Sequence, residues 1–126
     1  MQLTRELPEG YPGVRRVEPG AITVGDRTLT RSFLLMRERL VESWPADSVA
    51  ALDAPAIEAI IALAPDVLIL GTGERQTFPP QRVLAEFLTR GIGVEAMDNR
   101  AAARTYNVLL SEGRNALVAF MLPPGG

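Results

Sequence analysis

The sequence predicts an α/β domain in which a mixed β-sheet is flanked by helices. The first half of the chain holds short β-prone runs, and the second half alternates helix-like and strand-like segments. Size sets the number of domains, because 126 residues, of which 47% are hydrophobic, suffice for one core but not for two independent ones. We therefore expect a single domain over residues 1–126.

Five short β-prone runs make up most of the first half. In chain order they cover residues 14–18, 21–24, 27–30, 32–36 and 40–44. The second and third runs flank Gly25-Asp26, and a two-residue turn of this type between two such runs predicts a hairpin. The fourth contains the continuous apolar run Phe33-Leu34-Leu35, as expected of a buried strand.

The second half alternates between helix and strand. Helices are predicted over 54–64, from Pro79 or Pro80 up to Gly91, and from Asp98 to about Glu112, and strands over 67–70, 93–97 and 116–122. Residues 67–70 are apolar on both faces, which predicts a central parallel strand. The alternation implies parallel strands joined by right-handed crossovers.

The last predicted helix has recognisable ends. Asp98 is placed to accept backbone N–H bonds as its N-cap, and Gly113 is placed to end it with a positive φ. The buried side of this helix is predicted to consist of Ala101, Ala102, Thr105, Val108 and Leu109.

Proline and glycine mark both ends of the chain. They predict an irregular arm over 1–13 and a frayed tail over 123–126, around a core of about 14–122. The first residues lack the apolar stretch of a signal peptide, and no apolar run approaches the ~20 residues needed to cross a bilayer. We expect a soluble, cytoplasmic protein that does not span a membrane.

Composition excludes several classes of function. With 13 basic and 15 acidic residues the formal net charge is −2, and the charges are interspersed, so we expect no nucleic-acid binding. Every basic residue is an arginine, which excludes lysine chemistry. The absence of cysteine and histidine excludes disulfides, thiolate nucleophiles, zinc sites built on these residues and Ser-His-Asp catalysis. We expect no catalytic residue, no metal and no cofactor.

The clearest local motif is Gly71-Thr72-Gly73. It follows a predicted buried strand and precedes a helix, the position at which backbone N–H groups can hold a phosphate. The dinucleotide fingerprint is incomplete, because Gln76 stands where a third glycine belongs. A tight turn that needs a positive φ is the simpler interpretation of the two glycines.

A candidate ligand site follows from the predicted topology. The loops after two parallel strands, Gly71–Glu74 and Met97–Arg100, would share the carboxyl edge of the sheet and could form one crevice there. Arg100 and Arg104 lie one helical turn apart and could bind an anion, whereas Asp98 would oppose it. A solvated helix face with locally paired arginines is the structural alternative.

Tyr106-Asn107 lies in the middle of the last predicted helix. Asparagine is unfavourable there because its side chain competes for backbone hydrogen bonds, so a buried Asn107 needs specific partners. The pair is a candidate interaction site. The structural alternative is that Asn107 anchors a neighbouring loop while Tyr106 packs in the core.

Three stretches of the sequence resemble a known family. They are Ile69–Gly73, Gly91–Met97 and, most specifically, Ala103–Arg114 with its Thr-Tyr-Asn and Glu-Gly-Arg runs. The family is one of small α/β domains of largely unknown function that includes a mitochondrial complex I assembly factor and an adipogenesis-associated protein. The resemblance implies a three-layer fold, no established activity or cofactor, and a role in assembly for some members. Threonine is common after the aspartate in this family, whereas this chain has Asn99, which argues against chemistry by a hydroxyl there.

Two functions remain. The first is a non-catalytic binding or assembly module that acts through contacts with unidentified protein partners, favoured by the missing catalytic groups. The second is a protein or enzyme that binds a small anionic ligand in the crevice, with Gly71, Thr72, Gly73, Asp98, Arg100 and Arg104 as candidates. Exposed apolar side chains would favour the first, and a deep polar pocket the second.

Overall fold

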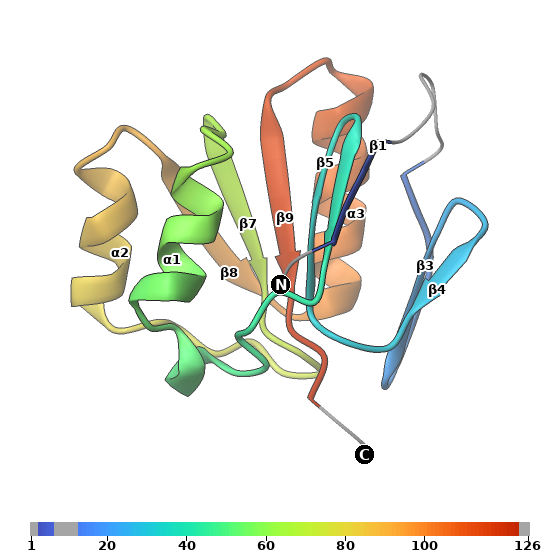
Figure 1. Cartoon of the computed structure of the whole chain (residues 1–126), viewed down its shortest axis with the longest axis horizontal. Coiled ribbons are helices and arrows are strands. Elements are labelled where there is room, and N and C mark those ends of the chain that lie inside the picture. Colours follow the sequence, from blue (N-terminus) through green and yellow to red (C-terminus); the bar gives the residue numbers. More distant parts are fainter. Residues whose placement is uncertain (1–2, 7–12, 124–126) are drawn as a thin grey trace.

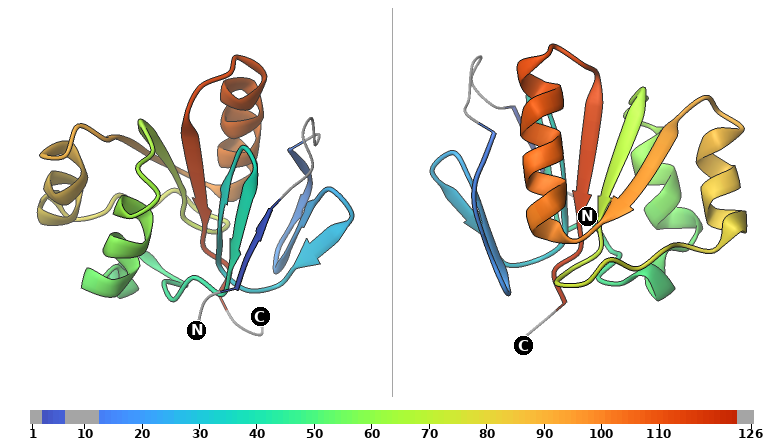
Figure 2. Two further views of the ribbon diagram at one scale, coloured as in Figure 1. Left: turned by 45° about the horizontal axis from the view of Figure 1, so that its top comes forward. Right: turned by 180° about the vertical axis from the view of Figure 1, so that it is seen from behind.

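The computed structural model describes residues 3–6 and 13–123. A six-stranded mixed sheet forms the middle layer, with helices α1 and α2 on one face and helix α3 with a three-stranded antiparallel sheet on the other (Figures 1 and 2). The elements in chain order are β1 Leu3–Glu6, β2 Val14–Glu18, β3 Ala21–Val24, β4 Arg27–Leu29, β5 Phe33–Met36, β6 Arg39–Glu42, a 3-10 turn Val49–Ala51, α1 Ala54–Ile61, β7 Val67–Gly71, α2 Gln81–Leu88, β8 Gly93–Met97, α3 Asn99–Ser111 and β9 Ala116–Phe120. The predicted α/β class and mixed sheet are confirmed.

Strand β7 occupies the predicted central place. The order of the large sheet is β1-β6-β5-β9-β7-β8, and β7 is parallel to both of its neighbours. Its residues Leu68 to Leu70 are almost fully buried, because α1 and α2 cover one face and α3 covers the other. The small sheet has the order β2-β3-β4, and β3 and β4 form the hairpin around Gly25, whose φ is +59°.

Two apolar clusters fill the two interfaces between the layers. The α1/α2 side is built around Trp44, Ile60 and Phe87, and the α3 side around Phe33, Phe120 and Tyr106. The rings of Phe33 and Phe120 pack at 5.2 Å between centroids across the β5–β9 pair. Both clusters contain residues of the large sheet, so this sheet is the common wall of the whole core.

Strand β1 corrects the predicted N-terminal arm. Residues 3–6 were expected to be irregular, but they pair antiparallel with β6 at the edge of the sheet, from Leu3↔Glu42 to Glu6↔Arg39. Nearby proline and glycine suggested an irregular chain, whereas an available sheet edge supplies backbone partners to any extended segment. Residues 7–12 of the arm and 124–126 of the tail lie outside the described residues.

Helix α3 buries a different side from the one predicted. Its buried residues are Asn99, Ala102, Ala103 and Tyr106, whereas Val108 is 55% exposed. The helix carries apolar residues around much of its circumference, so periodicity does not select one face. The inward side combines the large ring of Tyr106 with alanines that allow close approach to β7 and β9.

Helix α1 ends at Ile61, three residues before the predicted end. Ala64 has a φ of +51°, and Pro65 follows it. A residue before proline is disfavoured in the right-handed α region, so the chain leaves the helix before it reaches Pro65.

Gly113→Ala should lower the free energy of unfolding by about 1 kcal/mol, because Gly113 ends α3 at φ +75° and alanine is strained there. The site has room, since an added Cβ would meet its nearest atom, in the Arg37 guanidinium, at 3.8 Å. Urea unfolding measures the change. Gly93→Ala is the matched control, because Gly93 has an ordinary φ and its nearest neighbour would lie 4.0 Å away. An equal loss in both variants would contradict the conformational explanation.

Candidate functional site at the carboxyl edge of the sheet

The parallel strands β7, β8 and β9 end at one edge of the sheet. Gly71 is level with Met97 on one side and with Phe120 on the other. The segments that follow, beginning at Thr72, Asp98 and Met121, therefore leave the sheet together, at the bottom of the view in Figure 1. This edge is where the sequence placed the candidate crevice.

Hydrogen bonds join the two loops directly where the crevice was expected. Thr72 N donates to Met97 O at 2.9 Å, and Asn99 N donates to Gly73 O at 2.8 Å. Gly73 N in turn donates to Asn99 Oδ1 at 3.1 Å. The backbone N–H groups that would hold a phosphate are therefore already paired within the chain.

Asn99 is the organising side chain of this edge. It is only 6% exposed, and besides accepting from Gly73 N its amide donates through Nδ2 to Met121 O at 3.0 Å. One side chain at the start of α3 thus binds the segments after β7 and β9. Gly71 has no space for a side chain beneath it, since a Cβ would lie 2.5 Å from Asn99 Oδ1.

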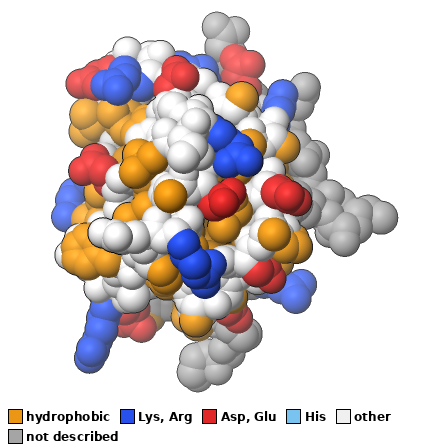
Figure 3. Space-filling model, turned by 90° about the vertical axis from the view of Figure 1, so that its left-hand side faces the viewer, with side chains coloured by type: hydrophobic (Ala, Val, Ile, Leu, Met, Phe, Trp, Pro, Cys, Tyr) orange, Lys and Arg blue, Asp and Glu red, His pale blue; other side chains and the backbone are white. Residues whose placement is uncertain are grey.

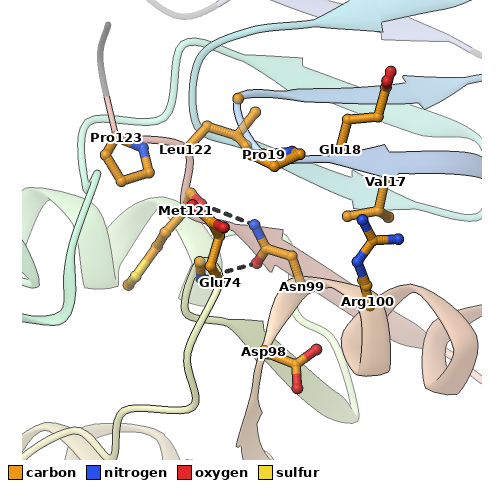
Figure 4. Close-up of a pocket in the computed structure, with 12 residues that line it drawn as sticks. Val17, Glu18, Pro19, Glu74, Asp98, Asn99, Arg100, Met121, Leu122 and Pro123 are labelled. Carbon is orange, nitrogen blue, oxygen red and sulfur yellow. Dashed lines mark hydrogen bonds between the residues drawn. The ribbon is translucent and has the colours of Figure 1, made fainter. Parts of the chain in front are cut away.

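A hollow of about 240 Å³ opens beside these bonds, toward the small sheet. The residues that line it are Val17, Glu18, Pro19, Gly20, Gly73, Glu74, Asp98, Asn99, Arg100, Met121, Leu122 and Pro123. In Figure 4, Asn99 lies in the middle, Arg100 extends toward Val17, and Glu18 and Asp98 lie on opposite sides. Four segments far apart in the sequence meet here: β2 with the turn that follows it, the loop after β7, the start of α3 and the segment after β9.

The predicted ligand residues separate into two groups. Gly73, Asp98 and Arg100 line the hollow. Gly71 is the last residue of β7, Thr72 begins the hydrogen-bonded loop after it, and neither of these nor Arg104 lines the hollow. Asp98 is the N-cap of α3, with Oδ1 accepting from Ala101 N at 2.9 Å. Its carboxylate thus occupies the helix N-terminus that an anion would need.

A family model described as "Protein of unknown function (DUF498/DUF598)" matches residues 14–121. The chain belongs to this family. The match spans the small sheet, all three helices, the carboxyl edge and every strand of the large sheet except β1, and it confirms the family indicated by the sequence.

Three similar proteins show what the family contains. A Xanthomonas campestris protein solved by NMR is 50% identical, with a TM-score of 0.80 over 87% of this chain and 83% of its own. The Danio rerio protein named NADH dehydrogenase [ubiquinone] 1 alpha subcomplex assembly factor 3 is 38% identical over 66% of this chain and 49% of its own. The "13 kDa major membrane protein" of Francisella tularensis is 32% identical over 55% of this chain and 56% of its own. The chain thus spans about half the length of these two curated relatives.

Phe78 is an exposed aromatic residue that the sequence interpretation missed. Its side chain is 72% exposed in the loop between β7 and α2. Thr72 fixes the start of this loop, because its Oγ1 donates to Arg75 O at 2.6 Å and accepts from Thr77 N at 3.0 Å. Pro79 further restricts the backbone at Phe78. In the sequence, this residue could have been found as the single aromatic residue in a polar stretch, directly before Pro79 and Pro80.

Tyr106 and Asn107 both make contacts within the fold. Tyr106 is fully buried in the core on the α3 side. The Asn107 side chain pairs with the backbone of Val14, accepting from its N at 2.9 Å and donating to its O at 2.9 Å. It thus anchors β2, and with it the small sheet, to α3.

Among residues 3–6 and 13–123, no group of three or more acidic side chains is arranged to hold a metal ion. In the same part of the chain no helix is both long and apolar enough to cross a membrane.

Asn99→Ala should lower the free energy of unfolding by about 2–4 kcal/mol, because it leaves Gly73 N and Met121 O buried without this partner. Thermal and urea unfolding measure the loss. Asn115→Ala is the control: that side chain is exposed and donates to Ala64 O, so its removal should cost less than about 1 kcal/mol. If the free energy of unfolding falls no more for Asn99→Ala than for Asn115→Ala, the side-chain hydrogen bonds of Asn99 add little to stability.

Proposed function

We propose that the chain is a non-catalytic binding module that acts in the assembly of other proteins through protein–protein contacts. Phe78 is the observation that carries the proposal. Phe78 is 72% exposed, and its backbone lies between Thr77, which donates to Thr72 Oγ1, and Pro79, so the backbone has less conformational freedom to lose on binding. Aromatic side chains are frequent binding hot spots. The name of the Danio rerio relative, an assembly factor, supports the same role.

The face of the molecule that carries α2 has a mixed composition. On the face that Figure 3 shows, apolar side chains are interspersed with arginine and acidic side chains. Leu88, at the end of α2, is 58% exposed and is a further apolar side chain that this chain leaves uncovered. A mixed surface with few aromatic anchors is typical of a non-permanent interface.

The second candidate, binding of a small anionic ligand at the carboxyl edge, has weaker support. Gly71 ends β7, the N–H groups of Thr72 and Gly73 are paired with Met97 O and Asn99 Oδ1, and Asp98 caps α3. Of the two arginines predicted to bind an anion, Arg100 lines the hollow and Arg104 does not. The proposed role needs neither a cofactor nor a catalytic residue. Location in the cytoplasm stays a prediction, because the Francisella tularensis relative is named a membrane protein.

Phe78→Ala should abolish partner binding without unfolding the protein, because its side chain lies largely in solvent. Tagged wild type and variant are cross-linked in the cells from which the chain comes, and bound proteins are quantified by mass spectrometry. Loss of a hot spot should reduce specific partners at least about tenfold. Val108→Ala is the control, because it removes an exposed apolar side chain from a different element, α3. This variant should retain the partners. Equal recovery in all three samples would refute the role of Phe78.

A further inference from the structure

The hollow at the carboxyl edge is small. Its volume of about 240 Å³ lies below the roughly 300–1,000 Å³ typical of small-molecule and cofactor sites. It is therefore smaller than the sites that usually enclose a nucleotide or a similar ligand. A single amino-acid side chain is the occupant of matching size.

The walls of the hollow are mainly apolar. Val17 and Pro19 line it from the small sheet, and Met121, Leu122 and Pro123 line it from the segment after β9. Met121 and Leu122 are buried and their backbones are fixed, since Met121 O accepts from Asn99 Nδ2 and Leu122 N donates to Ser32 Oγ at 2.9 Å. These walls favour an apolar side chain, and they are formed before it arrives.

The charged residues at the opening of the hollow, its rim, favour particular residues on either side of the bound side chain in the partner. Glu18, Glu74 and Asp98 provide three carboxylates, against the single guanidinium of Arg100. Glu18 and Glu74 are exposed, and neither carboxylate has a hydrogen-bond or ion-pair partner among residues 3–6 and 13–123. The rim therefore attracts positive charge and repels anions.

We propose that this hollow binds one apolar side chain of a protein partner and that its acidic rim selects basic residues beside that side chain. The inference rests on the proposed function, partner binding, and adds a second contact to that of Phe78. The occupant is thus a segment in which an apolar residue stands between arginines or lysines.

Blocked tripeptides test the inference on the purified full chain. Acetyl-Arg-Leu-Arg-amide should shift the NMR signals of Gly20, Gly73 and the Asn99 side-chain amide, and added salt should weaken its binding. Acetyl-Arg-Ser-Arg-amide lacks the apolar side chain, and acetyl-Glu-Leu-Glu-amide reverses the charge. Both should bind weakly or not at all. Equal binding of either one would overturn the proposal, as would shifts of these signals by inorganic phosphate and not by the Arg-Leu-Arg peptide.

Matched double variants distinguish an effect of the rim carboxylates on peptide binding from an effect of the protein's net charge. Glu18→Gln with Glu74→Gln should weaken binding of acetyl-Arg-Leu-Arg-amide about fivefold, as expected for two exposed charge contacts. Glu58→Gln with Glu86→Gln removes the same charge from exposed positions on α1 and α2 and should leave binding unchanged. An equal effect of both pairs would overturn the proposal.

The peptide test and the Phe78 test fail independently. If Phe78→Ala abolishes partner recovery but no peptide binds, the proposed function stands and the hollow is not its second contact. If the Arg-Leu-Arg peptide binds as described but Phe78→Ala changes nothing, the hollow stands and the role of Phe78 fails.

Discussion

The paired hydrogen bonds of Asn99 hold the carboxyl edge together. Its backbone N–H and its side-chain oxygen bind both polar groups of Gly73, and its side-chain N–H₂ binds Met121 O. A buried amide of this kind is stable only when its donors and acceptors are satisfied, and here the segments after β7 and β9 supply the partners. The shape of the hollow depends on this arrangement, because Gly73, Asn99 and Met121 all line it.

A second asparagine of α3, Asn107, also binds backbone groups of another segment. Asn107 pairs with both backbone groups of Val14, as a strand neighbour would, and so joins β2 to the helix. Gly13 has φ +84°, and an added Cβ there would clash with Asn107 Oδ1, so glycine and asparagine fit each other at this junction. Because β2 carries Val17 and Glu18, this second anchor fixes the wall of the hollow on the side of the small sheet.

These anchors use polar groups of the edge to maintain the fold, which supports the proposal of a binding role. The polar groups that could activate or hold a small substrate are engaged in maintaining the fold, and the carboxylate of Asp98 caps α3. Among residues 3–6 and 13–123, the edge also offers an apolar hollow with the unpaired carboxylates of Glu18 and Glu74, and the loop after β7 exposes the aromatic ring of Phe78. We propose that these features recognise another chain, and walls that are formed before binding would lower its conformational cost.

The sequence by itself determined the α/β class, the central parallel strand, the hairpin at Gly25 and the capping roles of Asp98 and Gly113. Each depends on a local pattern: apolar runs, turn residues, or a carboxylate or glycine at a helix end. Tertiary structure decided the inward side of α3, because its apolar residues occupy more than one face and only packing against the sheet selects Tyr106 over Val108. It also decided that residues 3–6 form a strand, since the edge partner that this strand needs lies 33 to 39 residues away in the sequence, from Glu6↔Arg39 to Leu3↔Glu42. Tertiary structure also formed the hollow, because its walls come from four segments that are distant in the sequence and that no local pattern brings together.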